Sequence, residues 1–241
     1  MNGVNTRHTN PGSALFQEQW TIYRKMVDHN YLFHREAYAI LRDALEAEAP
    51  PGFHFLDVAC GDARESSRAL AGLPVGRYRG IDCAAAALDL AEPELRRRLT
   101  CGVTLTESDY MPALRSATET YHVIWIGLSL HHLLQPEKLS ALTEIRRLLP
   151  PGQGSGLLLI YENTSPDGEA PAGWHARWDA QRPDWTAFAG EEWAAVADHV
   201  HREDHPETVS NWHRLGMEAG FHTVEQLYAC PTDLFRLFAF R

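Results

Sequence analysis

The sequence predicts an α/β protein with a doubly wound, seven-stranded sheet. From residue 53 onward, short apolar segments alternate with helical segments, and this alternation implies a mostly parallel sheet with helices on both faces. The last two strands, 223–229 and 234–240, are joined by a turn at 231–233. Because a parallel pair needs a longer crossover connection, this short turn makes the last strand antiparallel.

The composition is that of an ordinary globular chain with an acidic balance. Of the 241 residues 44% are hydrophobic, and the formal net charge is −10. This charge argues against a nucleic-acid surface, which needs clustered Lys and Arg. We expect no membrane association, because neither an apolar run of about 18 residues nor a signal-peptide pattern is present. The four cysteines form no CxxC pair, so we expect a reducing, cytoplasmic setting. The oligomeric state stays open between a monomer and a homodimer.

Residues 1–50 are expected to form an N-terminal tail and a helical lid, ahead of a main domain at 51–241. The first 13 residues are polar and contain Gly and Pro, which predicts a loose tail. Residues 14–47 show helical spacing of aromatic and apolar side chains, with a break at Asn30. Two interpretations stay open, simple packing on the main domain or a lid over a site. In the second, three side chains point into the site: Tyr23, Tyr31 and His34.

The strands of the main domain are predicted from short apolar runs that Gly and Pro separate. Pro50-Pro51-Gly52 ends the N-terminal helices, and the segment 121–127 is almost wholly apolar, as a central parallel strand is. The strands expected before the final pair are 53–58, 77–81, 102–107, 121–127 and 156–161. The helices expected between and after them are 64–72, 84–99, 112–117, 136–149 and 206–219.

Residues 164–206 interrupt the alternation and carry four of the seven tryptophans. We expect two helices there, 173–181 and 190–201, which form a helical cap after the fifth strand. Trp174 and Trp178 are candidate substrate-binding residues, since aromatic rings with polar tips suit the wall of a pocket. Simple burial of the insert on the domain would explain them as well. A lid and a cap together would enclose the site, which favours a small substrate over a macromolecule.

Acidic residues follow the first three strands of the predicted sheet. Asp57 lies in the first strand, Asp82 follows the second, and Asp109 follows the third. Because the carboxyl ends of parallel strands meet at one edge, these acids are expected at a common site. An acid after the second strand can accept hydrogen bonds from both hydroxyls of a ribose. The small-residue turn at 59–61 lets the backbone approach whatever is joined to that ribose.

These motifs resemble those of class I S-adenosylmethionine-dependent methyltransferases of the small-molecule type. LDVACGD at 56–62 resembles the glycine-rich first motif of that family, and GID at 80–82 and SDY at 108–110 match the acids after the next two strands. VIWIGLSLHHL at 123–133 matches the fourth strand and its loop. The resemblance implies a Rossmann-like sheet and methyl transfer from S-adenosylmethionine, with S-adenosylhomocysteine as the product.

The resemblance also implies which residues contact the cofactor. It places Ala59, Cys60 and Gly61 against the methionine part, with Asp57 near the ammonium group. It implies that Asp82 binds the ribose. The residues implied to lie near the adenine or the methyl-bearing sulfur are Cys83, Asp109, Tyr110, Ile126 and Gly127. Two further candidates for cofactor contact are Arg64, which opens the first helix, and Tyr23 of the lid.

The first motif departs from the fuller Gly-x-Gly-x-Gly pattern, because Ala59 and Ala63 replace its outer glycines. This departure also argues against the alternative function, a nicotinamide-dependent oxidoreductase. A dinucleotide turn needs Gly-x-Gly-x-x-Gly for close approach to a pyrophosphate. Here Asp62 would repel phosphates, whereas an acidic turn suits the positive charge of a sulfonium.

Candidate catalytic residues follow the fourth and fifth strands. His131 and His132 are candidate bases, needed only if the methyl acceptor arrives protonated, and His131 is also a candidate substrate contact. Glu162 is expected to bind a substrate amine or to act as a base, although capping the next turn would explain it equally well. We expect no metal site: His199, His201 and His205 do not share one helical face.

We therefore expect methyl transfer to a small molecule in an enclosed pocket. The acceptor atom stays open, because fold alone does not give it. A catalytically silent module that binds S-adenosylmethionine for regulation is the alternative.

Overall fold

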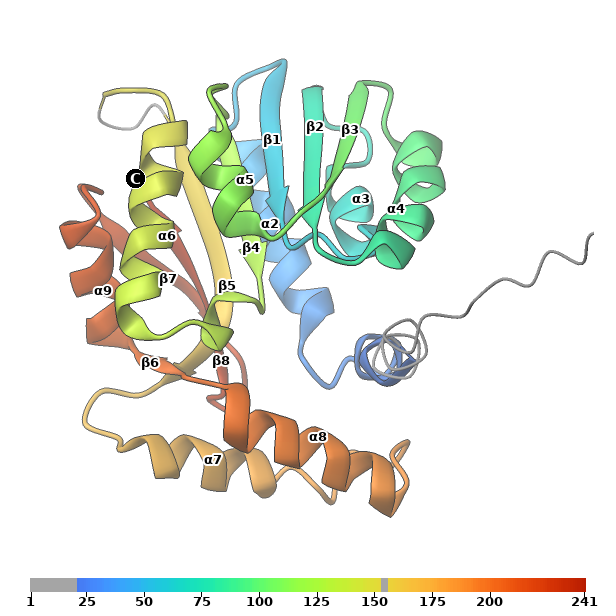
Figure 1. The fold of residues 1–241 in the computed structure, drawn as a ribbon, viewed down its shortest axis with the longest axis vertical. Helices are drawn as coiled ribbons and strands as arrows, with labels where there is room; N and C mark the ends of the chain where they lie inside the picture. The colour runs from blue at the N-terminus through green and yellow to red at the C-terminus, as the bar shows by residue number, and fades with distance from the viewer. Residues whose placement is uncertain (1–20, 153–155) are drawn as a thin grey trace, which may run out of the picture.

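The computed structural model describes residues 21–152 and 156–241, so the predicted tail at 1–13 lies outside the described residues. The sheet has the strand order β3-β2-β1-β4-β5-β8-β7 (Figure 1). Its strands are β1 (Phe53–Val58), β2 (Val75–Asp82), β3 (Gly102–Glu107), β4 (Val123–Gly127), β5 (Leu157–Ser165), β7 (Val224–Ala229) and β8 (Phe235–Phe240). Strand β8 pairs antiparallel with both β5 and β7, which confirms the predicted antiparallel last strand.

Helices cover both faces of the sheet, as the alternation predicted. On one face lie α2 (His34–Glu48), α3 (Arg64–Leu70) and α4 (Ala85–Arg98), and on the other α5 (Tyr110–Ser116), α6 (Gln135–Leu148) and α9 (Val209–Glu218). Side chains alternate between these layers along each strand. In β1, Phe55 joins the first core and Leu56 the second, as the two-residue period of a strand requires.

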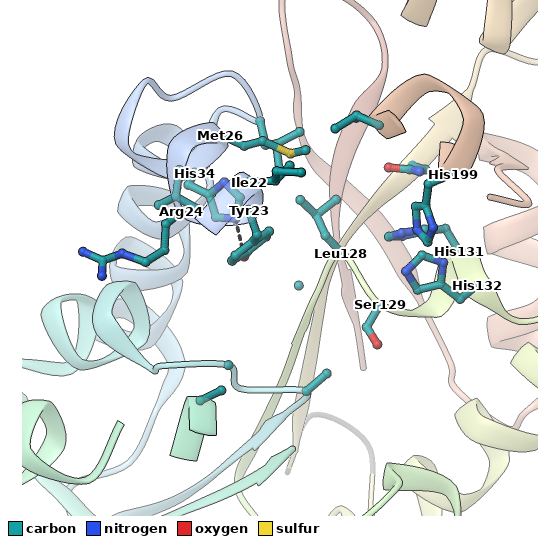
Figure 2. Close-up of a pocket in the computed structure, with 18 of the residues that line it drawn as sticks. Ile22, Tyr23, Arg24, Met26, His34, Leu128, Ser129, His131, His132 and His199 are labelled. Atoms are coloured by element: carbon teal, nitrogen blue, oxygen red, sulfur yellow. Dashed lines mark hydrogen bonds between the residues drawn. The ribbon is translucent and has the colours of Figure 1, made fainter. Parts of the chain in front are cut away.

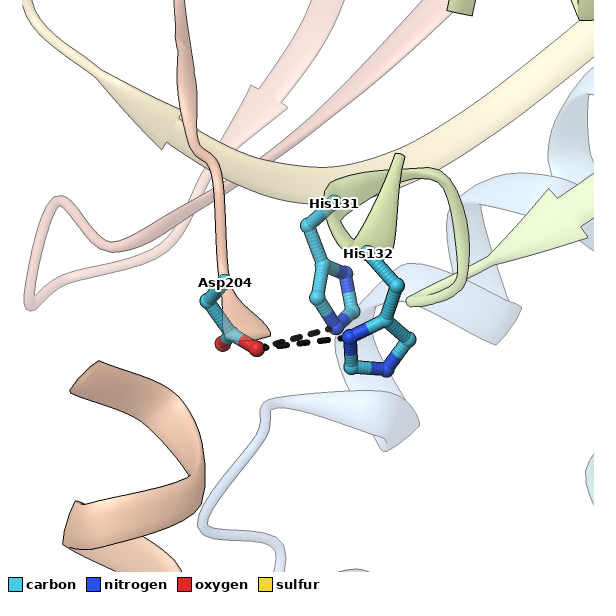
Figure 3. Close-up of side chains that lie close together, drawn as sticks. All are labelled: His131, His132 and Asp204. Atoms are coloured by element: carbon cyan, nitrogen blue, oxygen red, sulfur yellow. Dashed lines mark ion pairs between the residues drawn. The ribbon is translucent and has the colours of Figure 1, made fainter. Parts of the chain in front are cut away.

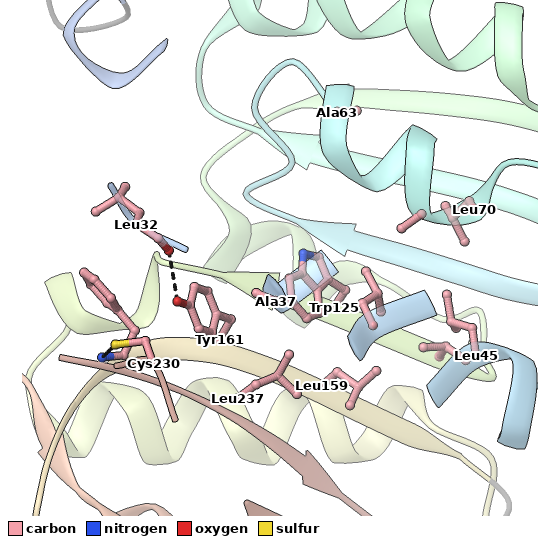
Figure 4. Close-up of a cluster of buried hydrophobic side chains, with 14 of the residues drawn as sticks. Leu32, Ala37, Leu45, Ala63, Leu70, Trp125, Leu159, Tyr161, Cys230 and Leu237 are labelled. Atoms are coloured by element: carbon pink, nitrogen blue, oxygen red, sulfur yellow. Dashed lines mark hydrogen bonds between the residues drawn. The ribbon is translucent and has the colours of Figure 1, made fainter. Parts of the chain in front are cut away.

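The first core lies between α2 and the sheet (Figure 4). It includes Trp125 of β4 and Leu159 of β5 together with Leu45 of α2. The Tyr161 hydroxyl in this core donates to the carbonyl oxygen of Leu32 at 2.9 Å. This bond fixes the start of α2 against the centre of the sheet.

Two predicted boundaries need correction. Strand β5 continues to Ser165, past the predicted end at 161, because its polar residues are buried and bonded. Arg236 and Trp212 donate to Thr164 there, and the short strand β6 (Glu207–Thr208) pairs with the same end of β5. The segment predicted as the start of a helix at 206 is therefore partly a strand.

The two predicted covers lie beyond the carboxyl ends of the strands (Figure 1). Residues 21–28 are helical, and the predicted break falls at Asn30, which has a φ of 57°. The insert contains α7 (Pro171–Asp179) and α8 (Gly190–Glu203), close to the two helices predicted. Among the described residues, no helix has the length and apolar character that a membrane crossing requires.

Candidate active site

A cavity of about 730 Å³ lies at the carboxyl edge of the sheet (Figure 2). Its walls come from the turn after β1, the end of β2, the loop after β4, the helix at 21–28 and α8. The edge lies at the point where the strand order reverses between β1 and β4, which is where open α/β sheets bind ligands. The volume is in the range of small-ligand pockets.

The turn after β1 has an unusual backbone that brings it close to the cavity. Ala59, Gly61 and Ala63 have positive φ values of 55°, 54° and 50°. Two of these are not glycines, yet alanine is small enough to take the left-handed conformation at moderate cost. The turn therefore has positive φ values at both positions where alanine replaces a glycine of the motif.

Asp82 joins this turn to the end of β2. Its Oδ2 accepts the Gly61 N–H at 2.8 Å, and its Oδ1 accepts the Ala84 N–H at 2.9 Å. Burial raises the pKa of Asp82, and the hydrogen bonds to Ala84 and Gly61 oppose this rise. Both oxygens face neighbouring backbone, and Asp82 also lines the cavity, so it is placed to meet a ligand beside the turn.

Glycine at position 80 leaves room for the side chains that pack below this turn. A Cβ there would lie 2.9 Å from the Sγ of Cys60 and 2.8 Å from the Leu105 Cδ2. Real Cβ atoms do not approach so closely, so a larger residue would force the side chains of Cys60 and Leu105 to shift. Gly80 therefore leaves room for the Cys60 side chain beneath the turn.

The structure brings most of the predicted cofactor residues to the cavity wall. Those that line it are Tyr23, Ala59, Cys60, Gly61, Arg64, Asp82, Cys83 and Gly127. Asp62 and Glu65 line it as well and make this end acidic. A ligand with a positive charge and a ribose fits these residues, because the carboxylates oppose phosphate and can accept from hydroxyl or ammonium groups.

Four predicted cofactor residues do not lie on the wall. Asp57 is buried behind the turn, where it accepts from the Tyr78 hydroxyl at 2.6 Å, and burial raises its pKa to about 6. Asp109 caps α5 by accepting the Met111 N–H, and Tyr110 is the first residue of that helix. Ile126 points into the second core, whereas its neighbour Gly127 reaches the cavity. Their predicted contacts with the cofactor stay predictions.

The N-terminal segment forms part of the wall, which favours the lid over simple packing. The Tyr23 hydroxyl lies 3.2 Å from Nε2 of His34, and both residues line the cavity (Figure 2). Burial lowers the pKa of His34 to about 4. Arg64 does not point freely into the site, because it pairs with Asp28 of the lid at 2.6 Å.

The lid also contacts the insert. Lys25 pairs with Glu192 of α8 at 2.6 Å. The Tyr31 ring stacks on Trp185 with centroids 4.7 Å apart, and the Tyr31 hydroxyl accepts the Ala187 N–H. Tyr31, a predicted substrate residue, therefore joins the two covers and is not part of the cavity wall.

The two predicted substrate tryptophans lie in successive layers. Trp178 lines the cavity, and its Nε1 has no hydrogen-bond acceptor among the described residues. Trp174 stacks behind it at 5.8 Å and donates its own Nε1 hydrogen to the Leu234 carbonyl. The structure thus brings Trp178, but not Trp174, to the site.

A buried carboxylate organises the loop after β4. Glu162 of β5 is fully buried, and its Oε1 accepts the N–H groups of Ser129 and Leu130 at 2.7 and 2.6 Å. Its Oε2 lies 2.8 Å from Nδ1 of His131, which belongs to the short 3-10 helix η1 (Leu130–His132). Burial would raise the pKa of Glu162, but His131 and the backbone donors lower it. Glu162 does not line the cavity, whereas His131 and His132 do.

Asp204, at the end of α8, completes this region and was not predicted. Its Oδ1 lies 3.8 Å from the Nε2 of His131 and 3.5 Å from the Nδ1 of His132 (Figure 3). Asn163 of β5 donates to the other oxygen at 2.8 Å. Asp204 lies within the HVHREDH segment, but its approach to His131 depends on the packing of α8, which no local pattern reveals.

The three histidines of that segment diverge, as their spacing predicted. His199 lines the cavity and lies beside His132, with ring centroids 5.4 Å apart. His201 faces away and pairs with Asp179 at 3.0 Å. His205 donates its backbone N–H to the His131 carbonyl oxygen.

Residues 55–152 match the protein family described as "Methyltransferase domain". The fold is similar to that of magnesium protoporphyrin IX methyltransferase (ChlM) from Synechocystis PCC 6803 with bound SAH. This comparison has a TM-score of 0.62 and 14% identity, and covers 95% of this chain and 94% of that one. No curated protein matches the sequence.

Two other solved structures resemble the chain over about half of their own length. CalO1, a methyltransferase in calicheamicin biosynthesis in its SAH-bound form, has a TM-score of 0.58 and 18% identity over 87% of this chain and 54% of that one. The pyocyanin biosynthetic protein PhzM has a TM-score of 0.56 and 18% identity over 85% of this chain and 53% of that one. The family match and the shared fold confirm the predicted resemblance to methyltransferases and the predicted fold class.

Proposed function

We propose that this chain, which carries a class I S-adenosylmethionine-dependent methyltransferase domain, transfers the methyl group to a small-molecule acceptor held in the same cavity. One observation carries the proposal. A single cavity runs from the turn bonded to Asp82 to the loop that carries His131, so cofactor and acceptor can share one space. ChlM and CalO1, which have a similar fold, are methyltransferases, and this supports the proposal.

The acidic end of the cavity is the proposed cofactor end. Asp82 would hold the ribose hydroxyls, the backbone of Ala59 and Gly61 would contact the methionine part, and Asp62 would face its positive charge. S-adenosylmethionine supplies an electrophilic methyl group when bound. The protein's task there is to fix position, since alignment and proximity account for much of the rate of such a displacement.

The loop after β4 and the end of α8 are the proposed acceptor end. His131, His132 and Asp204 face the cavity there with nitrogen and oxygen atoms, and Glu162 fixes the first of these from behind. We assign these groups to binding the nucleophilic group of the acceptor and stabilising its deprotonated form. Trp178 and Val196 give the neighbouring wall an apolar character, so an acceptor with an apolar body suits it.

The two covers support a small acceptor. The lid at 21–28 and helix α8 both line the cavity, and the Lys25–Glu192 ion pair connects them. A covered site excludes water and limits the size of what can enter. We keep residues 1–50 as a lid segment and 51–241 as the methyltransferase domain. We also propose a cytoplasmic setting, which the four free cysteines support.

Two measurements test the proposal. Isothermal titration calorimetry with S-adenosylhomocysteine should show one binding site per chain. Release of S-adenosylhomocysteine should then be followed with a panel of hydroxyl, amine and thiol compounds that have apolar bodies. Absence of cofactor binding would refute the proposal. Binding with no turnover on any acceptor would favour the catalytically silent regulatory module.

A further inference from the structure

We propose that His131, His132 and Asp204 bind a divalent cation at the acceptor end of the cavity. Each residue offers one ligand atom, and these atoms all lie within 4.8 Å of one another. The separations from the Oδ1 of Asp204 are 3.8 Å to His131 and 3.5 Å to His132. Ligands bound at about 2.0–2.2 Å from a metal stand roughly 3–3.5 Å apart, so the two distances from Asp204 are near those of a bound site, and the side chains would have to close on the ion.

The environment of the Asp204 Oδ1 atom is a separate observation, because this atom lacks a hydrogen-bond donor. Asp204 is only 6% exposed, and its Oδ1 accepts no hydrogen bond from any residue in the described ranges 21–152 and 156–241. The Oδ2 atom is held by Asn163, which turns the Oδ1 atom toward the two imidazole rings (Figure 3). A buried carboxylate oxygen without a partner is costly, and a cation would remove this cost.

His131 is oriented as a metal ligand is. Its Nδ1 faces Glu162 at 2.8 Å, which leaves Nε2 as the nitrogen directed at Asp204. Metal-binding histidines commonly direct their other ring nitrogen at a carboxylate, which fixes the ring and its tautomer. The distance of 3.8 Å from Nε2 to Asp204 is too long for a direct hydrogen bond, but it leaves room for an ion between the two atoms.

The charges nearby also favour a cation. Glu162 and Asp204 place two carboxylates in a buried region, and the neighbouring Lys138 is taken up by Glu207 at 2.9 Å. Buried charges in proteins are paired or coordinate metals. A divalent ion bound by two neutral imidazoles would balance both carboxylates.

The ligand set indicates the kind of cation and its use. Two imidazoles and one carboxylate suit Zn²⁺ or Co²⁺ better than Ca²⁺ or Mg²⁺, which prefer oxygen. Three protein ligands leave coordination positions open, and the His132 side chain is 43% exposed toward the cavity.

The use of the cation rests on the proposed function. The ion would hold a hydroxyl oxygen of the acceptor and lower the pKa of that hydroxyl. The O–H bond would then break with its electron pair kept on oxygen and its proton passed to solvent. The inferred acceptor class is a hydroxyl compound.

The test uses the full chain after removal of metal with EDTA and dialysis. Titration with Zn²⁺ alone and with Co²⁺ alone, followed by calorimetry and by the visible absorption of Co²⁺, should show one ion per chain. His132→Gln, which removes a direct ligand, and Asp204→Asn, which removes the charge of one, should each weaken binding by at least roughly 100-fold, since loss of an outer-shell partner alone costs about 10–100-fold. His201→Gln, which changes an exposed histidine of α8, is the matched control. This variant should bind the ion as the unaltered chain does.

Thermal unfolding and S-adenosylhomocysteine affinity are measured for every variant. His132 is partly exposed, so His132→Gln is expected to fold even if Asp204→Asn does not. Ion binding that is absent, or equal in His132→Gln and the unaltered chain, would overturn the cation site while leaving the methyltransferase proposal intact. Turnover that is unaffected by EDTA would overturn the role of the ion and assign His131 as a base. Loss of S-adenosylhomocysteine binding in the unaltered chain would instead refute the proposed function.

Discussion

Nδ1 of His131, in the short helix after β4, lies 2.8 Å from Oε2 of Glu162 in the adjacent strand β5. The other oxygen of Glu162 accepts two backbone N–H groups of the same loop. One fully buried carboxylate therefore ties together the loop that faces the acceptor end of the cavity. A charged group behind the loop therefore helps to hold it in position, together with the bond from the His205 N–H to the His131 carbonyl oxygen.

Glu162→Gln should destabilise the protein and reduce methyl transfer. The amide keeps the shape but loses the charge, and its NH₂ group can replace Oε2 only if the proton of His131 moves to Nε2, so that Nδ1 becomes an acceptor. Breaking a buried charged network of this kind costs about 3 kcal/mol of unfolding free energy, to be measured by urea denaturation. Glu144→Gln, which alters an exposed pair with Arg147 on α6, should change stability by less than about 1 kcal/mol. Equal effects of the two changes would show that the network is not important.

Asp82→Ala should strongly weaken cofactor binding. The change removes the acceptor for Gly61 and Ala84, so the turn after β1 loses its link to β2 as well as the proposed ribose contact. We expect S-adenosylhomocysteine affinity to fall at least about 30-fold, or about 2 kcal/mol, by calorimetry. Asp89→Ala, at an exposed position of α4, is the control and should bind normally. Unchanged affinity in Asp82→Ala would count against the assignment of the cofactor end.

Gly80→Ala should weaken cofactor binding without touching the cavity itself. The added methyl group would lie 2.9 Å from the Cys60 sulfur, so the side chain of Cys60, a residue that lines the cavity, has to shift. A loss of about tenfold in S-adenosylhomocysteine affinity, or about 1.4 kcal/mol, is expected. Gly102→Ala in the neighbouring strand β3 meets open space and should leave the affinity unchanged. Similar affinities for both variants would mean that Gly80 does not position the turn.

The fold could be predicted because its local signals agree with its tertiary structure. The apolar runs and the Gly and Pro between them placed the strands, and the short final turn gave the antiparallel strand. The end of β5 was missed because Glu162 and Thr164 are polar. Their partners come from distant parts of the chain, such as Arg236, so tertiary contacts override the local preference for a turn.

The cofactor end could be predicted better than the acceptor end for a geometric reason. Carboxyl ends of parallel strands meet at one edge, so the approach of Asp82 to Gly61 follows from topology. Strand parity explains why Gly127 reaches the cavity and Ile126 does not. Asp204 reaches His131 only because the insert folds back over the sheet, and that depends on contacts such as Tyr31 with Trp185.

Protein stability should fall as the pH drops from about 6.5 to 4, in part through His34. Burial lowers the folded pKa of His34 to about 4, whereas the unfolded chain takes up the proton near 6.5. Because the unfolded state binds more protons in this window, stability is complete above it and is lost on acidification, by up to about 3 kcal/mol. His34→Phe should reduce this loss, whereas His29→Phe, at an exposed lid position, should not. Urea unfolding at several pH values measures the stability of both variants. Identical pH profiles would exclude His34 as a source of the stability loss.

Lys25→Ala should loosen the lid while leaving the core stable. Lys25 bonds to both carboxylate oxygens of Glu192 and lies over the Phe188 ring, so it links the helix at 21–28 to the insert. The pair is partly exposed and adds little to global stability, but it opposes separation of the two covers. Hydrogen exchange should speed up in 21–28 and α8, and S-adenosylhomocysteine should dissociate several-fold faster by stopped-flow. Arg214→Ala, which removes an exposed pair with Glu218 on α9, is the control and should change neither rate. Exchange that stays the same in Lys25→Ala would show that the Lys25–Glu192 pair does not hold the covers together.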